Sequence, residues 1–349
     1  MAALDRYGPH AAGSPAAAGE TALAGELRRE LGRMVGMEHV VLFPTGWAAG
    51  FGAVNALVRR DDHIVADELV HACLNEGIAA ARTPHVTRTP HLDTTAVADA
   101  LRAIRARDTE HGILVITESL FSMNSDAPDL PEPQRVCREH GALLLVDQAH
   151  DIGVLGPEGK GVAAAQGVHG GLDLVVGSFS KAFATNGGYL ATGSEAVAAY
   201  TRYFGSTHIF SSALTPLQTA GALAAARLMA GPEGEARRAT LLDHAHTLRA
   251  ALSPTAASGC SVLGFPSPIV PLVVPSLDVG RTALRIAEAR GVLVHLVEFP
   301  VVPRGQARFR LQLSAAHRPD RVEAAGRVLA EAVAEATRHH TTPREAGRS

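Results

Sequence analysis

Short runs of apolar, largely β-branched residues alternate with longer stretches over residues 39–193, and this alternation constrains the fold most. Seven such runs are His39–Phe43, His63–Asp67, His85–Thr89, Ile113–Glu118, Ala142–Asp147, Asp173–Ser178 and Tyr189–Gly193. Near-continuous apolar runs are typical of strands that are buried on both faces of a parallel sheet. Helices are expected between them, for example over Ala22–Val35, Thr45–Val58 and Pro131–His140. The sequence therefore predicts an α/β protein, a three-layer sandwich with a mostly parallel seven-stranded sheet.

The C-terminal third has a different composition. A helical tract over Leu214–Met229 is expected to be interrupted by Gly231–Ala236 before a second helix ends near Leu252. Strands are then expected at IVPLVVP, LVHLVEFP and RFRLQLS, and helices at Arg281–Arg290 and Arg318–Ala336. We therefore predict an N-terminal arm (1–30), a large domain (31–240), a smaller C-terminal α+β domain (241–338) and a frayed tail (339–349).

The composition of the chain excludes several classes of protein. Of the 349 residues, 46% are hydrophobic and 19% are charged, which argues against disorder. The formal net charge is −3 and there is no run of Lys and Arg, so no nucleic-acid partner is expected. Three widely spaced cysteines form neither a disulfide framework nor a zinc pattern. Without a signal peptide or an apolar stretch of about 20 residues, we expect a soluble cytoplasmic protein with no membrane segment.

The segment GSFSKAFATNGGYL places Lys181 directly after a predicted strand. Two hydroxyl residues, Ser178 and Ser180, lie just before it. In open α/β sheets ligands bind beyond the carboxyl ends of the strands, where a lysine can form an imine with an aldehyde cofactor. The hydroxyls and backbone amides of such a turn can also hold phosphate. Alone, the segment is more typical of a surface lysine in a flexible loop, and it indicates a cofactor lysine only together with its neighbours.

The run ALLLVD ends in Asp147, 34 residues before Lys181, and His150 follows it closely. A carboxylate at the end of a strand can pair with the protonated nitrogen of a pyridine ring, which keeps the ring electron-accepting. His150 could then bind a phenolic oxygen of the cofactor or the substrate. The alternatives are that Asp147 caps a helix, or that both residues bind a metal ion together with Asp151.

Two further segments have a possible role in binding a cofactor. In FPTGWAAG, Gly46 and Trp47 begin a predicted helix, where free N–H groups favour an anion such as phosphate. The same segment is equally compatible with an ordinary helix N-cap by Thr45. In DELVHACLNEG, the ring of His71 could stack on a heterocycle, although a histidine on a helix face is more often structural.

Taken together, these segments resemble the α-oxoamine synthase family of fold-type-I enzymes that use pyridoxal 5′-phosphate (PLP). The resemblance covers about Tyr7 to Val328. The matching segments occur in the family's order, and they are PTGWAAG, DELVHACLNEG, ESLFSMNSDAPDL, VDQAHDIGVLGPEGKG, GSFSKAFATNGGYL, HIFSSALTP and VPRGQARFRLQLSAAH. The fold that the resemblance implies is the α/β sandwich that the strand pattern predicts.

The resemblance implies roles around the ring of PLP. Lys181 matches the lysine that forms the Schiff base and removes the α-proton of the amino acid. Asp147 matches the partner of the pyridine nitrogen, His150 the histidine on the phenolic oxygen, and His71 the histidine that stacks on the ring.

The resemblance also implies how the phosphate is held. Gly46 and Trp47 match the turn whose amides bind it, and Ser178 matches a hydroxyl ligand three residues before the lysine. Ser212 matches a hydroxyl that reaches the phosphate across the interface of a homodimer. The active site is therefore expected at a dimer interface.

Three more residues match the family's substrate and active-site motifs. Arg310, in ARFRL, matches the arginine that binds the carboxylate of the amino acid, a task that suits its bidentate fork. Glu118 and Ser122 match the glutamate and serine of the E-S-x-F-S-M motif, and the resemblance implies that both bind the cofactor. The implied reaction joins an amino acid to an acyl thioester, either acyl-coenzyme A or an acyl-carrier protein, and releases CO2 to give an α-amino ketone.

The sequence departs from the family at several places. Gln148 replaces an acidic residue, Pro15 replaces an arginine, and Ala24 replaces a histidine. Family members carry a further N-terminal segment near the substrate, so the resemblance does not specify that part of the acyl-donor pocket. Other PLP reactions on the same scaffold, such as transamination or aldol cleavage, are the alternative function. A PLP-binding regulatory protein without catalysis is less compatible with the joint presence of Lys181, Asp147, His150 and Arg310.

Overall fold

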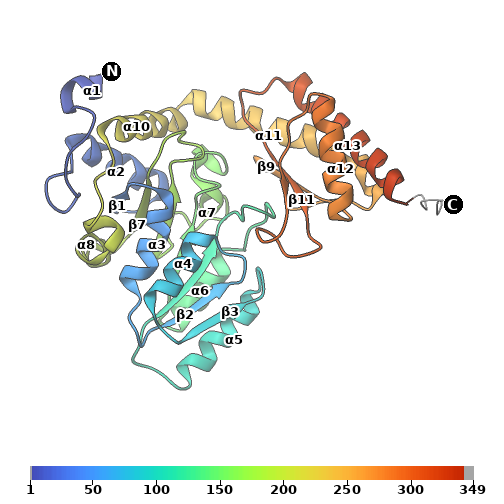
Figure 1. Cartoon of the computed structure of the whole chain (residues 1–349). Coiled ribbons are helices and arrows are strands. Elements are labelled where there is room, and N and C mark those ends of the chain that lie inside the picture. Colours follow the sequence, from blue (N-terminus) through green and yellow to red (C-terminus); the bar gives the residue numbers. More distant parts are fainter. Residues whose placement is uncertain (1, 342–349) are drawn as a thin grey trace, which may run out of the picture. The chain divides into compact units, whose positions relative to one another are not determined.

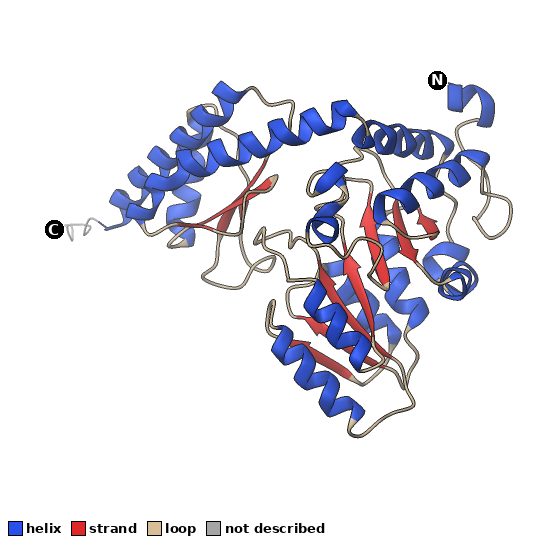
Figure 2. Cartoon of the chain, turned by 180° about the vertical axis from the view of Figure 1, so that it is seen from behind, coloured by secondary structure: helices blue, strands red, loops and turns tan. Residues whose placement is uncertain are grey.

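The seven predicted strands form one twisted sheet in the computed structural model, which describes residues 2–341 (Figures 1 and 2). The strands are β1 (His39–Phe43), β2 (His63–Asp67), β3 (Val86–Thr89), β4 (Ile113–Glu118), β5 (Leu143–Asp147), β6 (Leu174–Ser178) and β7 (Gly188–Thr192). Their order in the sheet is β1-β7-β6-β5-β4-β2-β3. Strands β3, β2, β4, β5 and β6 are parallel, and only β7 runs antiparallel to both of its neighbours. This confirms the predicted fold.

Helices cover both faces of the sheet. The helices of this part are α1 (Ala2–Tyr7), α2 (Ala22–Val35), α3 (Gly46–Leu57), α4 (Ala72–Ala81), α5 (Thr94–Arg105), α6 (Pro131–Glu139), α7 (Gly161–Ala165), α8 (Glu195–Phe204), α9 (Ser206–Ile209) and α10 (Pro216–Ala230), with a short 3₁₀ turn at Pro157–Gly159. Consecutive side chains of a strand point to opposite faces of the sheet, so they join two different apolar clusters. On β4, Val115 packs with residues of α2, α5, α6 and α10. Leu114 and Ile116 pack on the other face with residues of α3 and α4. The sheet is therefore the middle of three layers.

Four neighbouring parallel strands each end in a polar residue. These residues are Asp67, Glu118, Asp147 and Ser178, and all four are buried. Because parallel strands have their carboxyl ends at one edge of the sheet, the fold gathers these side chains on a single edge.

The chain divides into two compact units. The first contains the large sheet, and the second contains residues 122–126 and the chain from Ala236 onward. The sequence predicted the boundary at residue 240 and did not anticipate that residues 122–126 belong to the second unit. Arg308 holds this segment, because its guanidinium donates to the carbonyl oxygen of Met123 at 3.1 Å and to Oδ1 of Asn124 at 2.5 Å.

The second unit has an antiparallel sheet of its own. Its strands are β8 (Ser261–Val262), β9 (Ile269–Val273), β10 (Leu296–Val297) and β11 (Arg308–Gln312), in the order β10-β11-β9-β8. Its helices are α12 (Leu277–Ala289), α13 (Pro319–Thr341) and most of α11 (Pro232–Leu252), with a 3₁₀ turn at Ser253–Ser258. Phe309, which is fully buried, is central to the apolar cluster of this unit.

Two helix boundaries differ from the prediction. The interruption expected over Gly231–Ala236 is confined to Gly231, because Pro232 begins α11 at a position where its missing N–H is not needed. Helix α13 continues to Thr341, so residues 339–341, expected in a frayed tail, are helical, and residues 342–349 of that tail lie outside the described residues. Within residues 2–341, no helix is long and apolar enough to cross a membrane.

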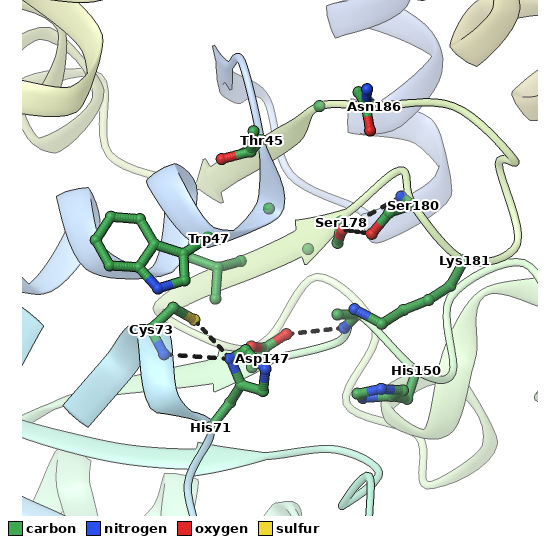
Figure 3. Close-up of a pocket in the computed structure, with 15 residues that line it drawn as sticks. Thr45, Trp47, His71, Cys73, Asp147, His150, Ser178, Ser180, Lys181 and Asn186 are labelled. Carbon is green, nitrogen blue, oxygen red and sulfur yellow. Dashed lines mark hydrogen bonds between the residues drawn. The ribbon is translucent and has the colours of Figure 1, made fainter. Parts of the chain in front are cut away.

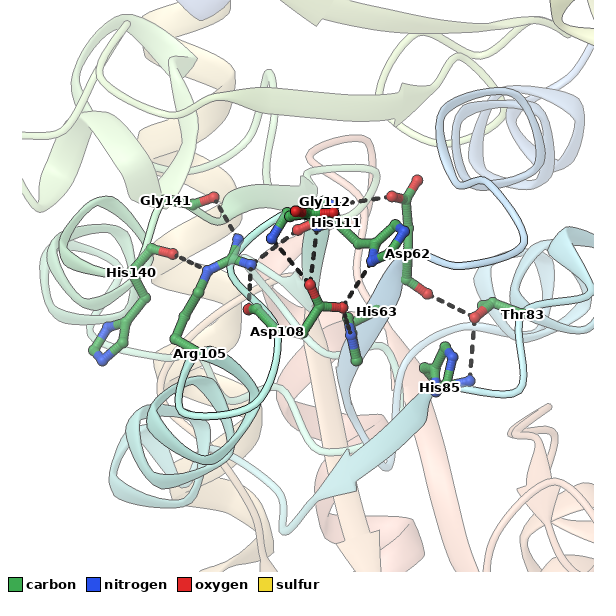
Figure 4. A network of polar contacts seen from close by, with 11 residues as sticks. Asp62, His63, Thr83, His85, Arg105, Asp108, His111, Gly112, His140 and Gly141 are labelled. Carbon is green, nitrogen blue, oxygen red and sulfur yellow. Dashed lines mark hydrogen bonds and ion pairs between the residues drawn. The ribbon is translucent and has the colours of Figure 1, made fainter.

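The edge of the sheet opposite to the polar strand ends carries a network of hydrogen bonds (Figure 4). The guanidinium of Arg105 donates to the carbonyl oxygens of Asp108, His111, His140 and Gly141. Oδ2 of Asp108 lies 2.9 Å from Nε2 of His63 and 2.9 Å from Nδ1 of His111. These contacts join the end of α5 to the starts of β2 and β4.

We predict that Asp108→Asn lowers the melting temperature more at pH 5.5 than at pH 8.5. The side chain of Asp108 raises the pKa of His111, so this pair stabilises the fold at low pH and its contribution is lost as the pH rises through the raised pKa. The pKa of Asp108 is lowered, mainly by His63, so the carboxylate is still ionised at pH 5.5. Thermal unfolding should show a loss of ~2 °C at pH 5.5.

The control is Asp99→Asn, which removes an exposed ion pair with Arg102 on α5. We expect no pH-dependent difference for that variant. Equal losses for Asp108→Asn at the two pH values would contradict the prediction.

Candidate active site

A cavity of about 310 Å³ lies at the polar edge of the large sheet (Figure 3). It brings together seven residues that the sequence singled out, namely Gly46, Trp47, His71, Asp147, His150, Ser178 and Lys181. They come from the ends of β5 and β6, the start of α3, and the residue before α4. Residues that are up to 135 positions apart in the chain therefore share one cavity.

Lys181 is the third residue of the loop between β6 and β7, and this loop is held by hydrogen bonds of its own backbone. The N–H of Phe179 donates to the carbonyl oxygen of Gly187 at 2.9 Å, and the N–H of Thr185 donates to the carbonyl oxygen of Phe179 at 3.0 Å. The N–H of Ala184 donates to the carbonyl oxygen of Lys181 at 3.0 Å. Figure 3 shows the Lys181 side chain reaching from this loop toward Asp147. The amine is thus presented to the cavity from a well-defined turn.

Asp147 supplies a buried carboxylate at the end of β5. Its side chain is 7% exposed, and Oδ1 accepts a hydrogen bond from the N–H of Ala149 at 2.9 Å. Within residues 2–341, Oδ2 receives no hydrogen bond from the chain. Burial raises the pKa of Asp147, while the Ala149 amide and the nearby His71 and Lys181 act in the opposite direction. A buried carboxylate with one oxygen unused is suited to a cationic partner.

His71 is held in one orientation beside Asp147. It is the N-cap of α4 and not, as the sequence suggested, a residue on a helix face. Its backbone N–H donates to Oε1 of Glu118 at 2.6 Å, and its Nδ1 accepts from the N–H of Cys73 at 3.2 Å. Because Nδ1 is an acceptor, the ring proton is assigned to Nε2. Burial lowers the pKa of His71, which favours this neutral form.

Glu118 stands behind His71 and does not line the cavity. Its side chain is 1% exposed, and burial and the charge of Asp147 raise its pKa well above the usual range. Its contact with the His71 amide means that it orients a cavity residue. The sequence had assigned Glu118 directly to the cofactor.

One end of the cavity is suited to an anion. Thr45 caps α3 by accepting from the N–H of Ala48 at 3.0 Å, so the N-cap role is present. Oγ of Ser178 lies 2.7 Å from Oγ of Ser180. A Cβ added to Gly46 would lie 2.3 Å from Ser178 Oγ, so glycine at position 46 allows the helix start to approach this pair of hydroxyls. Hydroxyls and the N–H groups of a helix start are common phosphate ligands.

Besides Glu118, three sequence-predicted residues lie away from the lining of this cavity. Ser122 and Arg310 belong to the second unit, where Nε of Arg310 donates to the carbonyl oxygen of Ser122 at 2.7 Å. Burial lowers the pKa of Arg310. Ser212 lies in the first unit, exposed on the segment after α9.

The cavity also contains residues that the sequence analysis did not assign to the site. Cys73 is buried, with its Sγ 3.1 Å from Nδ1 of His71, and Asn186 lines the cavity from the β6–β7 loop. The position of Cys73 two residues after a capping histidine could have indicated its contact. No pattern in the sequence around Asn186 indicated that it would line the cavity.

The donor set fits PLP better than a metal ion. Four kinds of group surround one cavity: the amine of Lys181, the buried carboxylate of Asp147 with one oxygen that accepts no hydrogen bond from residues 2–341, the neutral ring of His71, and the helix start at Gly46. No group of three or more His, Cys, Asp and Glu side chains in the described part of the chain is arranged to bind a metal ion. The carboxylate of Asp151, considered above as a metal ligand, accepts hydrogen bonds from Ser119 and Val162 instead.

Comparison with known proteins identifies the family. The sequence pattern of aminotransferase class I and II matches residues 3–329. The 8-amino-7-oxononanoate synthase of Trichlorobacter lovleyi is 35% identical over 321 residues, which cover 92% of this chain and 80% of that protein. The enzyme of the same name from Geobacter sulfurreducens is 35% identical over 328 residues, with 94% and 82% covered.

Solved structures give the same answer. Serine palmitoyltransferase from Sphingomonas wittichii superposes with a TM-score of 0.87 at 26% identity, covering 96% of this chain and 82% of that one. A high-resolution structure of SPT with its PLP internal aldimine gives a TM-score of 0.88 at 26% identity and the same coverage. The chain therefore belongs to the aminotransferase class I and II family and, within it, to the PLP-dependent α-oxoamine synthases.

Proposed function

We propose that this enzyme joins the α-carbon of an amino acid to the acyl group of a thioester, with loss of CO2 and release of a thiol, in the cytoplasm. One observation carries the assignment of residues to this chemistry: Lys181 and the buried Asp147 carboxylate flank the same cavity. The relatives named above support the condensation as the reaction type. Three buried cysteines without disulfides, all in the described residues, are compatible with a reducing compartment.

When bound, PLP supplies an aldehyde that condenses with amines and a ring that withdraws electrons from the α-carbon. In our proposal Asp147 holds the proton on the ring nitrogen through Oδ2. Nζ of Lys181 removes the α-proton of the amino acid, and the neutral ring of His71 covers the cofactor. His150 binds the phenolic oxygen and helps to polarise the acyl carbonyl. The lowered pKa of His71 supports its uncharged stacking role.

The phosphate is assigned to the start of α3 and to Ser178. The N–H groups of Gly46 and Trp47 are available there because the first residues of a helix have no acceptor in the preceding turn. The hydroxyl groups of Ser178 and Ser180, whose oxygens are 2.7 Å apart, supply further donors next to Gly46. We propose that Glu118 contributes indirectly, by fixing His71.

The carboxylate of the amino acid is assigned to Arg310. Its Nε donates to the carbonyl oxygen of Ser122, and within residues 2–341 its two terminal nitrogens have no hydrogen-bond partner. A guanidinium that is anchored at Nε presents both terminal nitrogens as a fork, which is the geometry that carboxylates bind. Ser122 therefore serves through its backbone.

We also propose that the enzyme acts as a homodimer in which Ser212 of one chain reaches the phosphate site of the other. The segment around Ser212 carries exposed aromatic side chains, with Tyr203 and Phe204 each 64% exposed and Phe210 86% exposed. Large exposed aromatics so close together are typical of a protein interface. The acyl donor would be acyl-coenzyme A or an acyl-carrier protein.

Replacing Lys181 by alanine should abolish the visible absorbance of bound PLP and lower thiol release from acyl-coenzyme A at least about 1,000-fold. The chain has only one other lysine, Lys160, which pairs with Glu158 at 2.7 Å. Lys160→Ala is thus a complete control and should retain absorbance and turnover. Unchanged turnover in Lys181→Ala would overturn the proposal. Amino transfer to a keto acid without thiol release would favour the aminotransferase alternative.

The change Arg310→Lys should raise KM for the amino acid by roughly 10- to 100-fold, because a point charge replaces a bidentate fork. KM for the acyl thioester should remain within about twofold. The matched control is Arg249→Lys, an arginine of the same unit that donates to the carbonyl oxygens of Leu263 and Gly264. Steady-state kinetics with each substrate varied in turn separates the two effects. Equal changes in both KM values would argue against a carboxylate site.

Gly46→Ala should weaken PLP binding about tenfold, because the new Cβ would push the α3 start away from Ser178. Gly25→Ala on α2 is the control, since the Cβ there would meet only the flexible end of Arg29 at 3.7 Å. Absorbance titration of the cofactor-free protein gives both affinities. If the two variants bind PLP equally well, the close approach at Gly46 is not important for the phosphate site.

A further inference from the structure

Asp151 is a buried acid next to the cavity to which the reaction above gives no role. It follows His150 directly, its side chain is 0% exposed, and it does not line the cavity. Oδ1 accepts a hydrogen bond from Oγ of Ser119 at 2.7 Å, and Oδ2 accepts one from the N–H of Val162 at 2.6 Å. One carboxylate thus joins the turn after β5 to the end of β4 and to the start of α7.

The glycine-rich loop is shaped around this carboxylate. Gly161 has a φ of +82°, and a Cβ at this position would lie 2.7 Å from Oδ2 of Asp151. The N–H of Gly161 donates to the carbonyl oxygen of Leu155 at 2.9 Å, which closes the loop on itself. Any larger residue at 161 would therefore both strain the backbone and displace the carboxylate.

Ser119 links Asp151 to Asp147. The Ser119 N–H donates to the carbonyl oxygen of Asp147 at 3.0 Å, and its Oγ lies 3.1 Å from the same oxygen. The hydroxyl has a single proton, so it donates either to Asp151 or to the Asp147 carbonyl. When Asp151 is ionised the proton faces Asp151. When Asp151 is protonated, its own O–H can donate to Ser119 Oγ, and the Ser119 proton turns to Asp147.

The surroundings of Asp151 raise the pKa of its carboxyl group. Burial and, to a smaller extent, the charge of Asp147 raise this pKa to about 6, against the opposing effect of the hydrogen bonds from Ser119 and Val162. The titratable groups on the segments packed around it are Glu118, Asp147, His150, Glu158, Lys160 and Tyr189. Lys160 and Glu158 pair with each other.

We propose that Asp151 is a positioning residue for the Asp147–His150 turn, and that its negative charge reinforces that of Asp147 toward a cationic ring nitrogen. The hydrogen bonds to Ser119 and Val162 fix the turn, and the ionised carboxylate adds a second negative charge behind Asp147. This inference rests on the proposed function, because it assumes that Asp147 meets the ring nitrogen of PLP. Asp151 touches neither cofactor nor substrate in this arrangement.

A direct consequence concerns stability. The pKa of Asp151 is higher in the folded chain than the value of about 3.9 that is usual in unfolded chains. Its stabilising contribution is therefore present below that value and is lost as the pH rises through about 6. Asp151→Asn cannot ionise. The melting temperature of this variant relative to the wild type should consequently increase between pH 5 and pH 8.

The decisive experiment measures the dissociation constant of PLP for the full-length chain, by visible absorbance, from pH 5 to pH 8. We expect Asp151→Asn to bind PLP as tightly as the wild type near pH 5, where Asp151 is neutral in both. At pH 8 the variant should bind roughly fivefold more weakly, because only the wild type carries the second charge. The ratio of the two constants cancels the titration of the cofactor itself.

The matched control is Asp173→Asn. Oδ2 of Asp173 accepts from Nε2 of Gln134 at 3.0 Å and from the N–H of Leu144 at 2.9 Å, but Asp173 precedes β6 and lies at the opposite edge of the sheet. The ratio of the PLP dissociation constant of Asp173→Asn to that of the wild type should not change with pH. Ser119→Ala provides a second test, because loss of a donor to Asp151 should move the change in PLP affinity to higher pH.

Each outcome decides one point. The role of Asp151 is overturned if the ratio of PLP dissociation constants, Asp151→Asn to wild type, does not depend on pH. It is also overturned if this ratio equals the one for Asp173→Asn at every pH. If Asp151→Asn does not fold, an unshifted pH dependence in Ser119→Ala overturns it. The proposed function fails separately, if wild-type protein binds PLP without dependence on Lys181.

Discussion

The half-satisfied carboxylate of Asp147 is the constraint on which the site depends. A charge in this position is unfavourable in the folded protein unless a cation meets it, because only one of its oxygens has a donor among residues 2–341. Parallel strands bring it to the same edge as Ser178 and the loop of Lys181, so the sheet itself determines what can face it. The strand order therefore places the carboxylate, the hydroxyl and the start of the lysine loop of the proposed cofactor site at one edge.

Several acids share this edge, and the chain separates them by giving each a different partner. Glu118, the strand partner of Asp147, accepts the His71 amide, while Asp151 accepts Ser119 and Val162. Like charges in a buried environment favour the protonated form, and burial raises the pKa of all three. Under the proposed function, this edge loses some folding stability while its acids control the charge at the ring nitrogen, as is common at active sites.

Much of this arrangement could be predicted from the sequence, for identifiable reasons. The runs that end in Asp147 and Ser178 were predicted to within a residue because strands buried on both faces are continuously apolar. The two-residue strand Ser261–Val262 has no such pattern and was missed. The indirect role of Glu118 and the contacts of Asp151 depend on side-chain hydrogen bonds between segments far apart in the chain, which no local pattern encodes. The family resemblance supplied Arg310, whereas spacing alone gave no reason to select it.

The segment Ser122–Asp126 has a consequence for how the chain connects the two units. Because it belongs to the second unit while its flanks belong to the first, the backbone passes between the units three times, after Phe121, after Asp126 and after Glu235. Three covalent connections therefore join the two units, where the boundary predicted from the sequence required only one. One crossing begins three residues after Glu118, and Arg310 is bonded to the first residue beyond it. The backbone segment that accepts the hydrogen bond of Arg310 thus continues directly from the end of β4 along the chain.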